Sequence, residues 1–385
     1  GHVYICLLVA LVELLLFREL VRVRYHVFFH TIEDTIPLFR TTQWLWFCVA
    51  IFYAYGDFIG EVITNNQDLH HLLYYSQYST SVAFTLYSGT FVLTIATIQV
   101  THIKFQINQL CWTVLVLCLT VGQLKYIMHN VFNGLFWFAL PILLVVVNDI
   151  MAYVCGMTFG RKFIRHAFIP FSPNKTWEGF IGGGLFTILS SWFLARFLAQ
   201  YTWMTCPTNE FRLYPRSLDC DLHPVFVEAQ YNFTPQLLAF LPSAIMRIVP
   251  GIVKMCSDLE TGVVQQCYGT PSELHDHFEL VLMQVYPIQF HALLLALFAS
   301  LVAPFGGFLA SAIKRAYGIK DFDSLIPGHG GVMDRMDCQF LMALCTWVHY
   351  NTFVSMATVS VPKLIYLFNL LNPSQKDEFL ASIDR

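Results

Sequence analysis

The chain of 385 residues contains few charged side chains. Lysine, arginine, aspartate and glutamate together make up 12% of it, and 22 basic against 25 acidic residues leave a formal net charge of −3. An ordinary soluble domain contains about 25% of these four residues and covers its surface with them. The shortage excludes an ordinary soluble globular protein, and the near-neutral balance excludes a polybasic protein that binds nucleic acid.

The sequence also lacks the cysteine spacings of a zinc site. Its 11 cysteines form no C-x-x-C pair and no Cys/His ligand pattern, so we predict no metal cage built from them. The chain starts at Gly1 rather than at a methionine and continues directly into an apolar stretch. We therefore expect the native N-terminus to lie upstream.

Apolar residues take the place of the missing charge. Hydrophobic residues make up 56% of the chain and aromatic residues 16%. Windows of apolar sequence recur that can cross about 30 Å of hydrocarbon, where an open strand edge would leave backbone groups unsatisfied. We predict an all-α, polytopic membrane bundle of about eight to nine transmembrane helices, forming a single domain over residues 1–385. The windows are 3–16 (interrupted by Glu13), 41–56, 69–103, 105–124, 126–148, 179–195, 280–313 and 338–362.

The window 280–313 is longer than one crossing requires. It contains Pro287, Pro304, Gly306 and Gly307, residue types that interrupt a helix. We therefore expect one broken or kinked helix, whose freed backbone lines a polar cavity.

The charged residues between the windows predict an orientation. Segments 149–178 and 314–337 each carry four basic residues, and basic loops prefer the cytosol, so we expect both segments on that side. Segment 201–279 carries nine acidic against four basic residues and is predicted to be a lumenal insertion. Its four cysteines either pair or stay free. They are Cys206, Cys220, Cys256 and Cys267.

Charge is concentrated in segment 311–337, which holds four cations, four carboxylates and one histidine between two apolar windows. The glycines at 328, 330 and 331 allow a turn with exposed N–H groups, followed by the positive end of a helix, and this arrangement suits phosphates. Asp334 and Asp337 are three residues apart and share a helix face suited to Mg²⁺, while Lys314, Arg315 and Lys320 would neutralise phosphate charge. The alternative is a solvated loop whose charges pair with one another.

A second polar segment precedes the window 179–195. Asp149 follows an apolar window, where an acid is costly unless it has a function. Lys175, Ser172 and Thr176 could hold a phosphate or the nucleotide, and Glu178 starts the next window. The alternative for Ser172 is a helix cap.

These segments resemble the phosphatidate cytidylyltransferases, also called CDP-diacylglycerol synthases. The resemblance covers nearly the whole chain, and the acidic insertion near Cys206 resembles the eukaryotic branch of the family. Two positions depart from the family pattern: Asp323 replaces a small residue, and Gly307 stands where bacterial relatives commonly carry an aspartate. The matching motifs are Ser-x-x-Lys-Arg at 311–315, Lys-Asp at 320–321, Pro-x-His-Gly-Gly-x-x-Asp-Arg-x-Asp at 327–337, Ser-Pro-x-Lys-Thr-Trp-Glu-Gly at 172–179, Asn-Asp-x-x-Ala-Tyr at 148–153 and Pro-Phe-Gly-Gly at 304–307.

The resemblance implies the reaction of CTP with phosphatidate to give CDP-diacylglycerol and pyrophosphate, with Mg²⁺ as cofactor. It places Asp334 on the metal and leaves the second ligand open among Asp321, Asp337 and Asp149. The expected catalytic residues are Lys314, Arg315, Lys320, Asp321, His329, Asp334, Arg335 and Asp337. The expected substrate-binding residues are Ser172, Lys175, Thr176, Glu178, Asp149, Gly330 and Gly331.

The expected setting is the endoplasmic reticulum membrane, with the site facing the cytosol, the lipid tails in the bilayer beside Pro304, and a homodimer left open. The first alternative function is another CTP-dependent membrane lipid kinase. The second is a polytopic transporter, although the charges lie at loop edges and no repeat is visible, which disfavours it.

Overall fold

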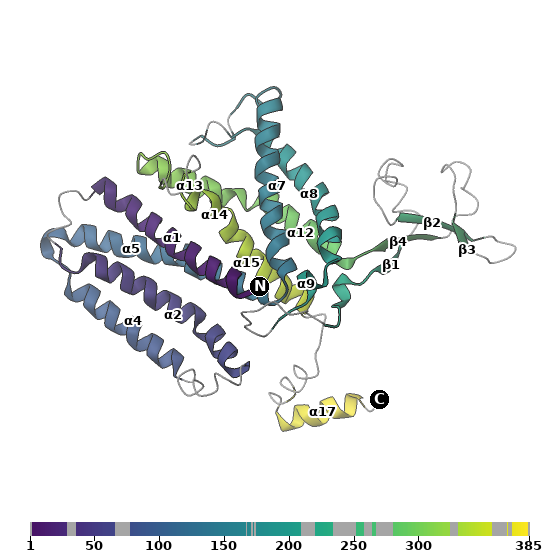
Figure 1. Ribbon diagram of the computed structural model, residues 1–385, viewed down its shortest axis with the longest axis horizontal. Helices are drawn as coiled ribbons and strands as arrows, with labels where there is room; N and C mark the ends of the chain where they lie inside the picture. Colours follow the sequence, from purple (N-terminus) through teal and green to yellow (C-terminus); the bar gives the residue numbers. More distant parts are fainter. Residues whose placement is uncertain are drawn as a thin grey trace.

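The helical bundle was obtained as a computed structural model (Figure 1). Five helical stretches in the part of the chain described below are long and apolar enough to cross a membrane: Ser79–Ala96, Val100–Phe132, Leu135–Phe159, Trp177–Ala199 and Pro287–Ala316. The predicted helical membrane bundle is therefore confirmed, while the count of eight to nine spans stays a prediction. The residues described are 2–28, 36–65, 78–166, 168–170, 172, 175–208, 220–233, 252–257, 264–266, 280–323, 330–355, 368 and 372–383.

The N-terminal helices pack through apolar side chains. Helix α1 lies against α5 and α6, and α2 lies against α4. Phe17 of α1 stacks on Phe47 of α2 with ring centroids 4.5 Å apart, and Leu124 of α6 is fully buried. These helices are α1 (His2–Phe28), α2 (Phe39–Asn65), α4 (Ser79–Ala96), the 3₁₀ turn η3 (Val100–His102), α5 (Ile103–Leu119) and α6 (Val121–Phe132).

Helices α7 (Leu135–Phe159) and α8 (Trp177–Ala199) pack closely because glycines face the neighbouring backbone. A Cβ on Gly183 would lie 2.9 Å from the Cβ of Ala152. The window 126–148 was wrong as a single crossing, because Gly134, with φ of +126°, separates α6 from α7. Asp149 consequently lies within α7 and does not end a helix.

The window 280–313 contains the predicted break. Two residues separate helix α12 (Pro287–Leu301) from α13 (Pro304–Ala316). The first six residues of the window were wrong as part of a helix, because they form strand β4 (Leu280–Val285).

A small antiparallel sheet, which the sequence did not predict, extends from the bundle (Figure 1). Its strands lie in the order β1-β4-β2-β3. Near it, a disulfide joins Cys206 to Cys220, which identifies one pair among the four cysteines, while Cys267 lies outside the described residues. The other elements here are α9 (Thr202–Thr205), the 3₁₀ turn η4 (Pro224–Phe226), β1 (Ala229–Phe233), β2 (Ile252–Ser257) and β3 (Val264–Gln266).

The charged segment 311–337 leads from α13 into the last bundle helix. It includes the single-turn helix α14 (Met333–Met336), which α15 (Gln339–His349) follows after a two-residue turn. The π-helical turn η5 (Tyr350–Val354) extends α15, and helix α17 (Pro373–Ile383) lies near the C-terminus. The segment thus lies at one end of α15, and η5 lies at the other.

Candidate active site

Asp334 is the centre of the polar contacts in segment 311–337. One oxygen, Oδ1, lies 2.6 Å from Lys314 Nζ on α13. The other, Oδ2, accepts hydrogen bonds from the backbone N–H of Gly331 at 3.0 Å and of Phe322 at 3.2 Å. Because only 10% of the Asp334 side chain and 20% of the Lys314 side chain are exposed, removing either partner would leave a poorly solvated charge.

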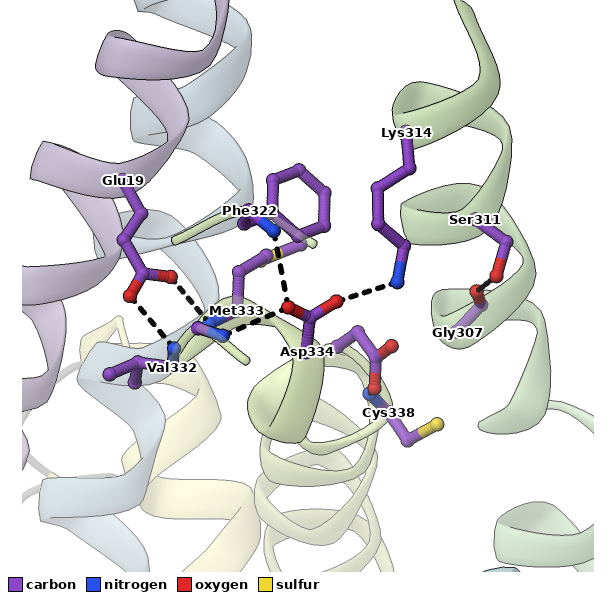
Figure 2. Close-up of polar contacts among 11 residues, drawn as sticks. Glu19, Gly307, Ser311, Lys314, Phe322, Val332, Met333, Asp334 and Cys338 are labelled. Carbon is purple, nitrogen blue, oxygen red and sulfur yellow. Dashed lines mark hydrogen bonds and ion pairs between the residues drawn. The ribbon is translucent and has the colours of Figure 1, made fainter. Parts of the chain in front are cut away.

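Glu19 holds the turn from the opposite side. Its two carboxylate oxygens accept the backbone N–H groups of Val332 and Met333, each at 2.8 Å, although Glu19 lies on α1, more than three hundred residues away in the chain. Figure 2 shows Glu19 and Lys314 reaching towards α14 from two different helices. Glu19 is 1% exposed, and its negative charge at the start of α14 satisfies donors that this helix leaves free.

The N–H groups of this turn consequently bind carboxylates of the protein itself. Gly331, Val332 and Met333 donate to Asp334 or Glu19, whereas the sequence predicted that N–H groups of the turn bind a phosphate. The N–H of Gly331 thus has a partner within the protein, and its contact with a phosphate stays a prediction. His329 and Gly328 lie outside the described residues.

Gly330 allows two carboxylates to converge. Its φ is +84°, and a Cβ there would lie 2.9 Å from Asp334 Oδ2 and 3.5 Å from Asp321 Oδ1. Within the described residues, no group of three or more His, Cys, Asp or Glu could hold a metal ion. Mg²⁺, however, is commonly held by one or two carboxylates together with substrate phosphates. Asp334 and Asp321 fit that mode of binding.

Asp337 contacts a different part of α13. Its Oδ1 accepts the N–H of Cys338 at 2.8 Å, and its Oδ2 would lie 3.3 Å from a Cβ on Gly307. Both Asp334 and Asp337 thus turn towards α13, as their spacing predicts. The structure brings Asp334 to Lys314 and Asp337 to Gly307.

Charged residues of the second polar segment, 149–178, act electrostatically on Asp337. Burial raises the pKa of Asp337 to about 6, the N–H of Cys338 opposes this, and the charges of Asp149 and Lys175 act on it in opposite directions. Arg335 in turn acts electrostatically on Asp149. The two segments that the sequence singled out therefore meet at one place.

Aromatic rings dock the second segment on α13. Phe168 packs against Phe308 of α13 with centroids 5.7 Å apart and against Trp177 at 4.5 Å. Lys175 Nζ lies 5.7 Å from the centre of the Phe308 ring. This packing brings Lys175 to the first half of α13, where Gly307 faces Asp337.

Two candidates in this segment have local structural contacts. Thr176 Oγ1 accepts the N–H of Gly179 at 3.2 Å and caps α8, so the cap is Thr176 and not Ser172. Glu178 Oε1 accepts the N–H groups of Phe163 at 3.0 Å and Ile164 at 2.8 Å. Glu178 therefore fixes the loop that follows α7.

Ser172 forms a small bridge instead of a cap. Its N–H donates to Ile169 O at 3.2 Å. This contact shapes the loop that carries Lys175.

The remaining charged candidates lie at the end of α13 and in the segment that follows it. Arg315 and Lys320 are exposed. Asp323, to which the sequence assigned no role, lies 3.6 Å from Arg22 of α1. This ion pair and Glu19 both join α1 to the turn, and neither was expected.

Comparisons with known proteins agree in one family. Residues 1–353 match the profile of the cytidylyltransferase family. A protein of Dictyostelium discoideum named probable phosphatidate cytidylyltransferase is 37% identical over 381 residues, which cover 99% of this chain and 71% of that protein. Phosphatidate cytidylyltransferase 1 of Arabidopsis thaliana is 33% identical, covering 99% of this chain and 81% of its own length. The phosphatidate cytidylyltransferase of Saccharomyces cerevisiae is 36% identical, covering 95% and 71%.

Proposed function

The chain belongs to the cytidylyltransferase family, and on this premise we propose that it transfers the cytidylyl group of CTP to phosphatidate. The products are CDP-diacylglycerol and pyrophosphate. The observation that carries the proposal is the cluster at the glycine turn, where Asp334 and Asp321 converge beside Lys314. The three relatives described above carry the name of this activity.

The chemistry needs no protein nucleophile. The phosphate of phosphatidate is an anion that attacks the α-phosphorus of CTP, while the bond to the leaving pyrophosphate breaks. The protein therefore has to position two anionic substrates and neutralise their charge. Lys314, Lys175 and Arg335 bring positive charge from three separate elements to this one region.

We further propose Mg²⁺ as cofactor, held by Asp334 and Asp321. Bound there, the ion would supply positive charge to the phosphates of CTP. Lys314 orients Asp334 through the contact of 2.6 Å. Glu19 fixes the start of α14 and therefore the direction in which Asp334 points.

We place this end of the bundle on the cytosolic side of the endoplasmic reticulum membrane. The basic residues of segments 149–178 and 314–337 support that side, since basic loops prefer the cytosol. The Cys206–Cys220 disulfide supports a lumenal position for the opposite end, because disulfides persist in oxidising compartments.

The test is an assay of the purified full chain with CTP, phosphatidate and Mg²⁺. We expect pyrophosphate release that needs both substrates, and a lipid product whose mass has increased by one cytidylyl group. A lipid kinase would release CDP and add one phosphate to its lipid, and a transporter would consume no CTP. Folded protein that forms no CDP-diacylglycerol would refute the proposal.

A further inference from the structure

A groove lined by apolar side chains runs from the candidate active site into the bundle. Its volume is about 270 Å³, and α1, α6, α7, α14 and α15 contribute its walls. Among its lining residues, the polar ones are Arg335, Gln339 and Asn130. Arg335 follows Asp334 directly in the chain, so the groove is charged at the end nearest the site.

The other end of the groove lies deep along the helices. It passes from Arg335 on α14 to Gln339 and Ala343 on α15, and on α7 from Val146 to Trp137. On α7, which is continuous, the nine residue steps from Val146 to Trp137 span about 13 Å. Val146 lies one turn from Asp149, so on α7 as well as on α14 and α15 the groove starts beside the site and leads away from it.

The groove is also open at its side. Helices α1 and α7 each pack on α6, and α7 also packs on α15, which leaves the groove between α1 and α7. Leu8 on α1 and Val146 on α7 line it and are 55% and 42% exposed. Helix α7 is one of the candidate membrane spans, so this opening faces the hydrocarbon of the bilayer.

We propose that this groove binds one acyl chain of phosphatidate, with the lipid phosphate at the Arg335 end. The proposal rests on the proposed function and adds the location of the lipid chain. An acyl chain is the occupant because the walls are apolar, the opening faces lipid, and the single charged lining residue lies beside Asp334. Methylene groups of the acyl chain that are buried along the groove contribute binding free energy. The proposed site for this acyl chain lies between α1 and α7, and a position of lipid tails beside Pro304 stays a prediction from the sequence.

A second cavity provides a matched control. It has a volume of about 560 Å³ and lies among α2, α4, α5 and α6. No residue of segment 311–337 lines it. Ala83 in this cavity and Ala343 in the groove are both buried, 4% and 7% exposed, so the same substitution can be made in each.

The experiment compares Ala343→Phe with Ala83→Phe in the full chain, using dioctanoyl and dioleoyl phosphatidate in mixed micelles. Ala343 lies on α15, one turn beyond Gln339 and farther from Arg335, at a depth that a long acyl chain reaches and a short one does not. We expect Ala343→Phe to lower kcat/KM for dioleoyl phosphatidate about tenfold and to leave the value for dioctanoyl phosphatidate nearly unchanged. Ala83→Phe should leave both values nearly unchanged.

A second variant protects the test against misfolding. Leu8→Trp changes an exposed residue at the deep rim of the groove, and we expect the same selective loss for the long substrate. An equal loss for both substrates, or no loss in two folded variants, would overturn the proposal and indicate a groove filled by bulk lipid. Absence of product from both substrates with the wild-type chain would instead refute the proposed function.

Discussion

The two ends of the helical bundle are held together by different interactions. At the end that contains Asp334, the contacts join charged groups to backbone N–H groups or to one another. Glu19 accepts two N–H groups from the start of α14, and Lys314 pairs with Asp334. These contacts come from α1 and α13, so the end is assembled from helices far apart in the chain.

At the opposite end of the bundle, a disulfide and packed aromatic rings hold the elements together. The disulfide joins Cys206 to Cys220. Phe226 of η4 packs against Phe136 of α7 with ring centroids 5.0 Å apart. These contacts offer no charge to a substrate. The difference indicates that the first end keeps charged groups for chemistry, whereas the second end contributes stability.

Asp334→Asn should produce the largest effect. The variant loses the ion pair with Lys314 and one of the two converging carboxylates. We expect kcat/KM for CDP-diacylglycerol formation to fall about a thousandfold. The matched control at the opposite end is Asp221→Asn, an exposed acid that should retain the wild-type rate. Equal losses in the two variants would contradict the assignment of chemistry to the Asp334 end.

Glu19→Gln should produce the next largest effect. The amide keeps one acceptor but directs N–H atoms at a backbone donor, and it removes the negative charge at the start of α14. We expect kcat to fall about 10- to 100-fold with a smaller change in KM, because the substitution acts through the orientation of Asp334.

The control for Glu19 lies on the same helix. Glu13 is equally buried and accepts a hydrogen bond from Tyr55 at 2.5 Å, away from segment 311–337. Glu13→Gln should preserve the catalytic rate of the folded protein. If both glutamine variants lowered kcat alike, Glu19 would have only a general role in stability.

Cys206→Ser should affect stability and not catalysis. The disulfide closes a loop with a sequence separation of 14, and its loss should lower the free energy of unfolding by about 2 kcal/mol. The activity of the folded variant per molecule should remain that of the wild type. Cys111→Ser, which changes an exposed free cysteine, is the control. Thermal unfolding with and without reductant measures the difference.

The smallest effect is a pH dependence of stability at the end that contains the disulfide. Burial lowers the pKa of His223 below its ordinary value of 6.5, and His223 Nδ1 accepts the N–H of Val225 at 3.2 Å. His223 therefore takes up a proton more readily in the unfolded state, and its protonation favours unfolding. The stability that neutral His223 contributes above pH 6.5 is lost as the pH falls below 6.5. Comparing the unfolding temperatures of wild type and His223→Asn from about pH 8 to about pH 5 checks this, since the gap should shrink. A constant gap would contradict it.

Much of the charged end could be predicted from sequence. Its charges lie close together in the chain, and Asp334, Lys314 and Gly330 stand within one segment. Glu19 could not be predicted, because its partners Val332 and Met333 come from a distant segment and only the packing of α1 brings them together. Sequence spacing carries no signal for such a contact.

The elements of the opposite end were harder to predict for a different reason. Leu280–Val285 is as apolar as the helix that follows it, so hydropathy does not distinguish β4 from α12. The break between α6 and α7 depends on the positive φ of Gly134, and a glycine within an apolar window does not by itself end a helix. Strand pairing determines β4, and the backbone angle of Gly134 determines the break between α6 and α7.

The most direct measurement follows the fate of labelled CTP. Purified wild-type chain is incubated with phosphatidate, Mg²⁺ and CTP carrying a radiolabel on either the α- or the γ-phosphate. We predict that the α-label enters the lipid and the γ-label leaves in pyrophosphate, with lipid labelling lost in Asp334→Asn. Transfer of the γ-label to the lipid would contradict the central claim and identify a kinase.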